Sequence, residues 1–165
     1  MKTMEDFFHT LTFLNNKQIE NNFLFLGEGI ARKVYALDDD YVIKIAKGVD
    51  GLFQNQVEYY VYRKVNTKLL SYLCPILAFN PKMILMKRAI PLSKYNRNKR
   101  INLNTIREEK NSAADLNYLA EIYYLYYNDI VSSSSWGELN NKNVLIDYGC
   151  TSVAGDRYYG KLFDI

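Results

Sequence analysis

The sequence predicts an α+β fold, in which an antiparallel sheet with one main helix precedes a smaller group of helices. Short apolar runs alternate with turn residues between Leu26 and Met86, which is typical of strands. Apolar residues recur at helical spacing over 50–67 and again over 112–130. The chain has 165 residues, of which 48% are hydrophobic, and this is enough for one domain with a core.

An amphipathic helix is expected at the start of the chain. Its apolar stripe consists of residues at helical spacing: Met4, Phe7, Phe8, Leu11 and Leu14. Thr3 and Asp6 have the spacing of a capping box. We expect the stripe to pack on the sheet, with a membrane-surface role as the alternative. His9 is the only histidine and lies on the polar side, so the sequence predicts no metal or triad chemistry based on histidine.

A glycine-containing turn followed by a strand lysine is the most informative segment. Gly27 and Gly29 lie where a first strand turns, and glycines let the backbone approach a phosphate without an obstructing side chain. A second strand follows the turn at Asp38–Asp40. Lys44 lies between two isoleucines but faces the other side of that strand, so its ammonium can emerge under the glycine turn. Nucleotide phosphates require this combination of bare backbone and cation.

This segment resembles the eukaryotic-like protein kinases, whose pattern is G-x-G-x-x-G-x-V followed by V-A-I-K. Here it reads Gly27-x-Gly29-x-x-Arg32-x-Val34, followed by Tyr41-Val42-Ile43-Lys44. Arg32 takes the place of the third glycine. The resemblance implies a protein kinase-like fold with a small lobe, made of a five-stranded antiparallel sheet and one main helix, and a reduced helical large lobe. It also implies binding of ATP and Mg²⁺.

The resemblance extends over residues 23 to 165 and implies a single kinase-like domain. Residues 1–86 would form the small lobe with the N-terminal helix. Residues 87–111 would form the hinge and a basic loop, and residues 112–165 a minimal large lobe. The last part would contain a long helix from Ser112 to Ile130, for which Ser112 and Asp115 are spaced as a capping box.

Glu58 lies on the expected helix over 50–67, fourteen residues after Lys44. In the kinase family a glutamate on this helix pairs with the strand lysine and holds it against the nucleotide phosphates. The resemblance therefore implies an ion pair between Lys44 and Glu58. The alternative is an ordinary exposed glutamate on an amphipathic helix.

Two further strands are expected at 76–79 and 83–86, separated by a turn at Asn80-Pro81. The resemblance places Met86 at the back of the adenine pocket. It assigns hydrogen bonds to the adenine base to the backbone groups of Lys87 and Ala89, with residues 87–91 as the hinge.

Basic residues are dense between residues 87 and 110: Lys87, Arg88, Lys94, Arg97, Lys99, Arg100, Arg107 and Lys110. This segment is poor in apolar residues and is expected to be a loop. One interpretation is a solvated surface. The other is a docking patch over Lys94 to Arg100 for an acidic protein partner, a phosphate group or a nucleic acid.

The segment Trp136-Gly137-Glu138-Leu139-Asn140-Asn141-Lys142-Asn143 resembles the kinase catalytic loop, H-R-D-L-x-x-x-N. Leu139 and Asn143 match in register. The resemblance assigns the role of catalytic base to Glu138, in the place of aspartate, and that of a metal ligand to Asn143.

A second metal-binding aspartate should lie on the strand that returns toward Asn143. We expect residues 143–147 to form the outgoing strand and 159–164 the return strand, which makes Asp164 the metal ligand. The alternative takes Asp147-Tyr148-Gly149 as the D-F-G equivalent. It leaves three residues between Asn143 and Asp147, too few for a hairpin between them.

Three functions are compatible with this pattern. The first is a minimal, weakly active Ser/Thr protein kinase, and the second is a pseudokinase that binds a protein partner. The third is a small-molecule phosphotransferase of the aminoglycoside or choline kinase type. Two cysteines without a disulfide framework favour a reducing cytoplasm, including that of a host cell if the source is a virus or phage. The net charge of +3 does not indicate a nucleic-acid partner, and no apolar run is long enough to cross a bilayer.

Overall fold

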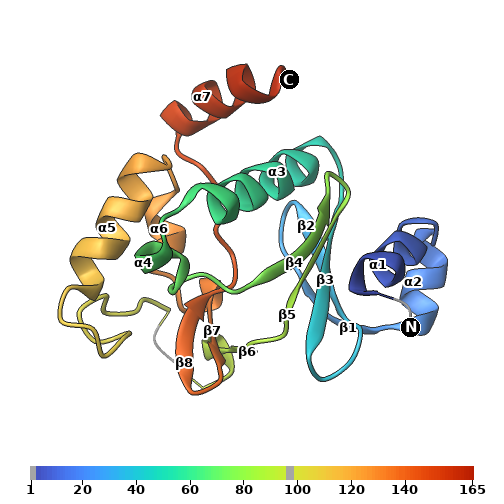
Figure 1. Cartoon of the computed structure of the whole chain (residues 1–165), viewed down its shortest axis with the longest axis horizontal. Coiled ribbons are helices and arrows are strands. Elements are labelled where there is room, and N and C mark those ends of the chain that lie inside the picture. The colour runs from blue at the N-terminus through green and yellow to red at the C-terminus, as the bar shows by residue number, and fades with distance from the viewer. Residues whose placement is uncertain (1–2, 96–98) are drawn as a thin grey trace. The chain divides into compact units, whose positions relative to one another are not determined.

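Figure 1 shows the computed structural model of the chain, which describes residues 3–95 and 99–165. The chain divides into two compact units. Unit 1 consists of Met1–Tyr59 and Pro75–Arg88, and unit 2 of Tyr60–Cys74 and Ala89–Ile165. Each unit contains a sheet of its own.

Unit 1 is built on a five-stranded sheet in the order β1-β2-β3-β5-β4. Its strands are β1 (Leu24–Glu28), β2 (Arg32–Ala36), β3 (Tyr41–Ala46), β4 (Ile76–Asn80) and β5 (Met83–Lys87). All neighbouring strands are antiparallel. The structure therefore confirms the five-stranded antiparallel sheet that the sequence analysis expects.

Two N-terminal helices, α1 (Met4–Thr12) and α2 (Asn16–Asn22), pack on one face of this sheet (Figure 1). Their contact is an apolar core formed by Phe8, Leu11, Ile19, Tyr35, Ile43, Met83 and Leu85. Alternation along a strand places Tyr35 and Ile43 on this face of β2 and β3. The stripe of the first helix thus packs on the sheet, as expected.

Both N-terminal helices begin with a capping box. Thr3 and Asp6 form the expected one, and Asn15 and Gln18 form a second at the start of α2. The first helix ends at Thr12, before the Leu14 of the expected stripe. The helix α2 is absent from the sequence-based expectation, because its seven residues contain a single apolar side chain and show no periodicity.

The main helix of the chain is α3 (Val49–Lys64). It begins one residue before the start of the expected range, 50–67, and ends three residues before the end of that range. A single turn of helix, α4 (Thr67–Leu70), follows. Gly51 lets α3 approach the sheet closely, because a Cβ there would lie 2.3 Å from the carbonyl oxygen of Ala31. Farther along the helix, the ring of Tyr59 stacks on Phe79 of β4 with 4.2 Å between ring centres.

Unit 2 contains a three-stranded sheet with several short helices. Its strands, in the order β6-β7-β8, are β6 (Ile90–Pro91), β7 (Trp136–Leu139) and β8 (Lys142–Leu145). Its further helices are the 3₁₀ turns η1 (Leu92–Lys94) and η2 (Ser133–Ser135) and the α-helices α5 (Ser112–Ile122), α6 (Tyr127–Ile130) and α7 (Val153–Phe163). The indole of Trp136 is fully buried and donates a hydrogen bond to the Ile130 carbonyl oxygen at 2.8 Å.

The long helix expected over 112–130 is wrong. It is interrupted after Ile122, where Tyr124 adopts a left-handed conformation with φ 53°, and the chain resumes as α6. The expected capping box is also absent, because the Ser112 hydroxyl donates to the Leu103 carbonyl oxygen instead. Asp115 accepts hydrogen bonds from Lys68 and from the hydroxyl of Tyr72. Both side chains therefore tie α5 to other segments of unit 2.

Among the helices that the structure describes, none has the length and apolar character needed to span a membrane.

Candidate functional site

The glycine turn connects β1 to β2 and is tightly closed. Gly27 has φ 155°, a conformation that side-chain-bearing residues rarely adopt, and the register between the two strands shifts at this point. The N–H of Gly29 donates to the Arg32 carbonyl oxygen at 2.9 Å. Ile30 lies at the tip with 95% of its surface exposed. The turn therefore presents backbone and one apolar side chain to solvent.

Lys47 binds the glycine turn from the end of β3. Its ammonium donates to the carboxylate of Glu28 at 2.8 Å and to the carbonyl oxygen of Gly29 at 3.1 Å. The hydrogen bond from Lys47 lowers the pKa of the Glu28 carboxyl below its usual value. The role of Lys47 could not be predicted from the sequence, because its contacts depend on the shape of a turn that lies eighteen residues earlier.

Lys44 and Glu58 form the expected ion pair, which the structure confirms. The Lys44 ammonium lies 2.8 Å from one carboxylate oxygen of Glu58 and 3.1 Å from the other. The Glu58 side chain is fully buried, and that of Lys44 is 7% exposed. A buried charge is costly unless it is paired, so the pair belongs to the framework of unit 1. The alternative of an exposed glutamate is wrong.

Arg32, the residue in the place of the third glycine, joins the same cluster. Its Nη1 atom lies 2.5 Å from Oε2 of Glu58 and 3.3 Å from Oδ1 of Asn55. Because side chains alternate along β2, Arg32 and Val34 point to the face that α3 covers, while Lys33 points to the opposite face. The guanidinium thus contacts side chains of α3 on that face of the sheet.

The other expected nucleotide contacts of unit 1 lie on the sheet. Val34 pairs with Lys44 across β2 and β3, and Met86 is buried in β5. Lys87 ends β5, and its N–H donates to the Pro75 carbonyl oxygen at 2.9 Å. This N–H is therefore occupied within unit 1. Ala89, the second expected backbone contact, is the residue with which the second segment of unit 2 begins.

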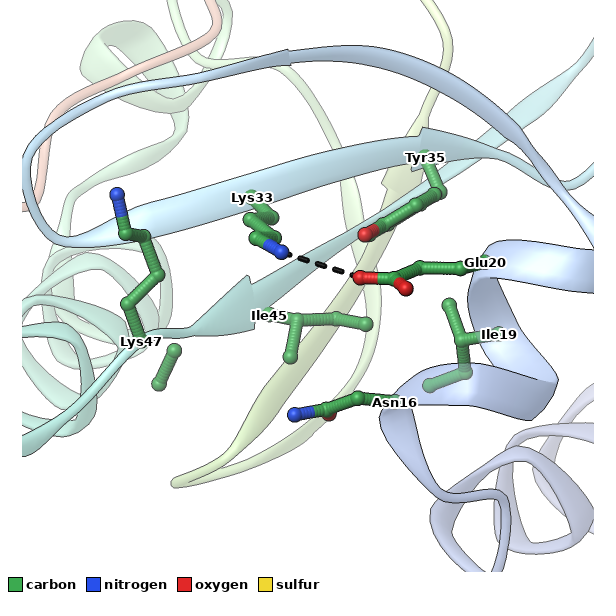
Figure 2. Close-up of a pocket in the computed structure, with 8 residues that line it drawn as sticks. Asn16, Ile19, Glu20, Lys33, Tyr35, Ile45 and Lys47 are labelled. Atoms are coloured by element: carbon green, nitrogen blue, oxygen red, sulfur yellow. Dashed lines mark hydrogen bonds and ion pairs between the residues drawn. The ribbon is translucent and has the colours of Figure 1, made fainter.

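A cavity of about 250 Å³ lies on the face of the sheet that α2 covers. Figure 2 shows Glu20 of α2 reaching Lys33 of β2, with Tyr35 and Lys47 nearby. The Lys33 ammonium lies 3.1 Å from the Glu20 carboxylate, and this hydrogen bond raises the pKa of Lys33. Burial raises the pKa of Tyr35. None of the expected site residues lines this cavity, and its two lysines are each paired with a glutamate.

In unit 2, residues 136–145, which include the expected catalytic loop, form a β-hairpin. Glu138 of β7 and Asn143 of β8 are directly opposite each other in the antiparallel register. Asn140 and Asn141 form its two-residue turn with φ 52° and 62°, and such a turn requires positive φ at both positions. Glu138 is solvent-exposed on a strand.

Asn143 has contacts within unit 2 that hold the segment before α5. Its side-chain amide donates to the Ile106 carbonyl oxygen at 2.8 Å, and its own carbonyl oxygen accepts from Arg107 at 3.0 Å. Arg107 also pairs with Glu109 and donates to the Ser71 carbonyl oxygen. Arg107 is buried, so it is not part of the solvated basic surface that the sequence analysis expected. Arg97, in the expected docking patch, lies outside the described residues.

The expected return strand over 159–164 is wrong, because these residues belong to α7 and its C-terminal cap. The Ser152 hydroxyl accepts from the N–H of Gly155 and begins the helix, and Asp164 ends it in the left-handed conformation with φ 56°. The expected outgoing strand, β8, is itself the return strand of the hairpin with β7. It leads directly to Asp147, the aspartate of the alternative alignment.

Asp129 and Asp147 both act on the thiol of Cys150. Burial raises the pKa of Cys150 to about 11, and the negative charges of Asp129, Asp147 and Asp156 contribute, as does a hydrogen bond to Asp129. The structure therefore brings the aspartate of α6 and the aspartate after β8 to the surroundings of one side chain. Both aspartates are partly buried.

Asp129 is the functional candidate that the sequence analysis missed. In Tyr127-Asn128-Asp129-Ile130, an aspartate followed by an aliphatic residue matches the D-L of H-R-D-L-x-x-x-N, with Ser134 in the place of the asparagine. The two-asparagine turn was the signal that could have identified it. A hairpin centred on that turn is followed by Asp147 and preceded by Asp129. These two aspartates therefore lie on either side of the hairpin in the sequence.

Among the described residues, no group of three or more His, Cys, Asp or Glu side chains could hold a metal ion by itself. Mg²⁺ is usually bound by one or two carboxylates together with waters and substrate phosphates.

No known protein family and no curated protein matches this sequence. Among solved structures, the chain is similar to APH(2'')-IIa in its ternary complex with streptomycin and ATP, with a TM-score of 0.37 and 21% sequence identity. The similarity covers 64% of this chain and 33% of the length of APH(2'')-IIa.

Proposed function

We propose that this chain is a kinase-like protein that binds the phosphates of ATP through Lys44 and the glycine turn. The observation that carries the proposal is the buried ion pair of Lys44 and Glu58 at 2.8 Å. Lys44 pairs across the sheet with Val34, which pairs with Gly27, so one part of the sheet carries both a cation and the glycine turn that phosphates require. Gly27 and Gly29 provide the backbone of that turn.

In unit 2, we propose Asp147 as the Mg²⁺ ligand and Asp129 as the residue that orients the attacking hydroxyl. Asp147 follows a return strand and Asp129 lies before the hairpin, which is the order of the two acidic motifs in the kinase pattern. The local structure differs from the expectation at the two metal ligands expected from sequence, Asp164 and Asn143, and at the expected base, Glu138. Asp164 is kept as the comparison variant in the test.

The activity that this set supports is slow phosphoryl transfer to a hydroxyl group of a protein. Phosphoryl transfer depends mainly on positioning and charge neutralisation, for which Lys44, Asp129 and Asp147 supply groups. Ser134 in the place of the asparagine removes one metal ligand, and this favours a nucleotide-binding scaffold without transfer as the second candidate. A docking role for the residues around Lys94 and Arg100 stays a proposal on their charge.

Calorimetric titration with ATP, in the presence and absence of Mg²⁺, tests the proposal. We expect saturable binding that Lys44→Met weakens by about 10- to 100-fold, because the substitution removes a hydrogen bond between charged groups. Lys82→Met is the matched control, since Lys82 is an exposed lysine at the turn between β4 and β5. Lys47 is unsuitable as a control, because it binds the glycine turn.

The metal assignment is tested in the same titration. Asp147→Asn should remove the Mg²⁺ dependence of binding, whereas Asp164→Asn should leave it unchanged. The reverse result would restore the assignment to Asp164. Absence of binding at millimolar ATP would contradict the proposed function as a whole. Transfer of labelled phosphate to a protein substrate, lost in Asp129→Asn, separates the kinase from the non-transferring scaffold.

A further inference from the structure

Two cations of unit 1 bind the same buried carboxylate from different directions. Lys44 contacts both oxygens of Glu58, at 2.8 and 3.1 Å, and Arg32 contacts one of them, Oε2, at 2.5 Å. All three residues have at most 6% of their surface exposed. Glu58 comes from α3, whereas its two partners come from neighbouring strands, so the cluster ties the helix to the sheet.

Arg32 is fixed independently of Lys44. Its Nη1 atom also donates to Asn55, one turn before Glu58 on α3. The side-chain amide of Asn55 in turn donates to the Pro81 carbonyl oxygen at 3.0 Å, at the turn between β4 and β5. A guanidinium is planar and always charged, so its contacts fix the direction of the carboxylate more strictly than an ammonium can. The network therefore holds Glu58 through contacts that do not involve Lys44.

We propose that Arg32 is a positioning residue that keeps the pair of Lys44 and Glu58 assembled. This inference rests on the proposed function for its effect on nucleotide binding, but its effect on the folded state does not depend on it. Arg32 holds the carboxylate, so Lys44 has a fixed partner before any nucleotide is present. Arg32 in the place of the third glycine of the kinase pattern then has a role of its own, which is to hold the Glu58 carboxylate.

The proposal predicts two couplings of opposite sign. For nucleotide binding, Arg32 acts through Lys44, so its removal should matter little once Lys44 is gone. For folding, each cation can partly neutralise the buried Glu58, so removing Arg32 should cost more once Lys44 is gone. A residue that only fills space under the sheet would change both quantities by the same amount in both backgrounds, because independent contributions add.

The test is a double-substitution cycle with Arg32→Met, Lys44→Met and the combined variant, since methionine keeps most of the apolar stem. Affinity for Mg-ATP is measured by calorimetry, and stability by the urea midpoint of the far-ultraviolet circular dichroism. Arg32→Lys, which keeps the charge, is the rescue variant. Lys33→Met is the matched control, because Lys33 is the next residue of β2 and is paired with Glu20 on the opposite face.

We expect Arg32→Met to weaken Mg-ATP binding about 10-fold in the native chain and less than about 2-fold in the Lys44→Met background, as for contacting residues. Arg32→Lys should restore part of the affinity, and Lys33→Met should leave it unchanged. The urea midpoint should fall further on Arg32→Met when Lys44 is already replaced.

The outcomes separate the two proposals. If the native chain binds Mg-ATP and Arg32→Met weakens binding equally in both backgrounds, the positioning role is overturned while the proposed function stands. If the native chain does not bind Mg-ATP, the proposed function fails, and the urea cycle alone decides on Arg32. Equal shifts of the urea midpoint in both backgrounds would then overturn the inference.

Discussion

The two units hold their candidate carboxylates in opposite surroundings. In unit 1, the carboxylate of Glu58 is fully buried and contacts two cations. In unit 2, Asp129 and Asp147 are partly exposed, and the group on which both act is the thiol of Cys150. The charge of Glu58 is therefore compensated inside unit 1, whereas the two aspartates of unit 2 lie partly exposed to solvent.

This difference predicts that the two groups of carboxylates affect different properties of the chain, its stability and its reactivity. A buried carboxylate with cationic partners is a structural element, because removal of any member leaves an uncompensated charge. The two aspartates of unit 2 are partly exposed, so their surroundings include solvent. Substitutions in the cluster of unit 1 should therefore change stability first, and those at the aspartates of unit 2 should change reactivity while the fold remains.

Replacement of Glu58 gives the largest expected effect. Glu58→Ala leaves the cations of Arg32 and Lys44 buried without the carboxylate, which should cost about 3–5 kcal/mol in the free energy of unfolding. Urea denaturation followed by circular dichroism measures it. Glu138→Ala is the control from unit 2, where an exposed carboxylate should change stability by less than about 0.5 kcal/mol. Equal costs for the two glutamates would refute the contrast between buried and exposed carboxylates.

A smaller effect is expected where α3 approaches the sheet. The new Cβ of Gly51→Ala would lie 2.3 Å from the Ala31 carbonyl oxygen, so the helix must move. We expect a net loss of about 1–2 kcal/mol, because the overpacking cost of about 1–3 kcal/mol exceeds the gain in helix propensity. The same denaturation experiment measures this loss.

Gly48→Ala is the matched control, since its Cβ would meet nothing within 4 Å. If Gly51→Ala were as stable as the native chain, the close contact of α3 with Ala31 and Ala46 would be wrong. The position of Glu58 relative to Lys44 would then have to be reconsidered too.

The smallest effect concerns the thiol of unit 2. The pKa of Cys150 rises from its usual value of 9.0 to about 11. At pH 8 its reactive thiolate should therefore be about 10²-fold rarer than that of an ordinary cysteine. Asp129→Asn removes one negative charge beside the thiol, which lowers the pKa of Cys150 and should speed its alkylation several-fold. Mass spectrometry of the peptide that contains Cys150 measures the rate.

Asp164→Asn is the control for this experiment, because Asp164 does not contribute to the shift of Cys150. The sign is fixed by charge, since a nearby anion disfavours the thiolate. An unchanged rate in Asp129→Asn would mean that burial and the other two aspartates hold the thiol protonated without Asp129. It would also remove the support for placing Asp129 near Asp147.

Much of unit 1 could be predicted from the sequence, because strand alternation and helical spacing constrain each other there. Lys44 faces away from two core isoleucines, and Glu58 lies on the buried stripe of a helix, so few arrangements could satisfy both. The contacts of Arg32 and Lys47 could not be predicted in this way. The direction of a long side chain depends on its partners, and these lie far away in sequence.

Unit 2 is less predictable from the sequence, because residue types at a motif's spacing do not show where its hairpin lies. Glu138 and Asn143 have the right spacing for a catalytic loop, yet the turn at Asn140 and Asn141 pairs them across two strands. The segment over 153–163 contains aromatic residues that favour strands. Its Ser152 cap was the local signal that a helix begins there.

Trp136 provides an intrinsic fluorescence probe of unit 2. It is the only tryptophan of the sequence, and its indole is enclosed within unit 2. Its emission should therefore shift to longer wavelength when unit 2 opens, whereas circular dichroism follows the whole chain. Coincident transitions by the two signals would show that both units melt as one cooperative body, and separate transitions would show that each has its own melting temperature. If the two transitions separate, Trp136 emission can show whether a substitution lowers the stability of unit 2 or of unit 1.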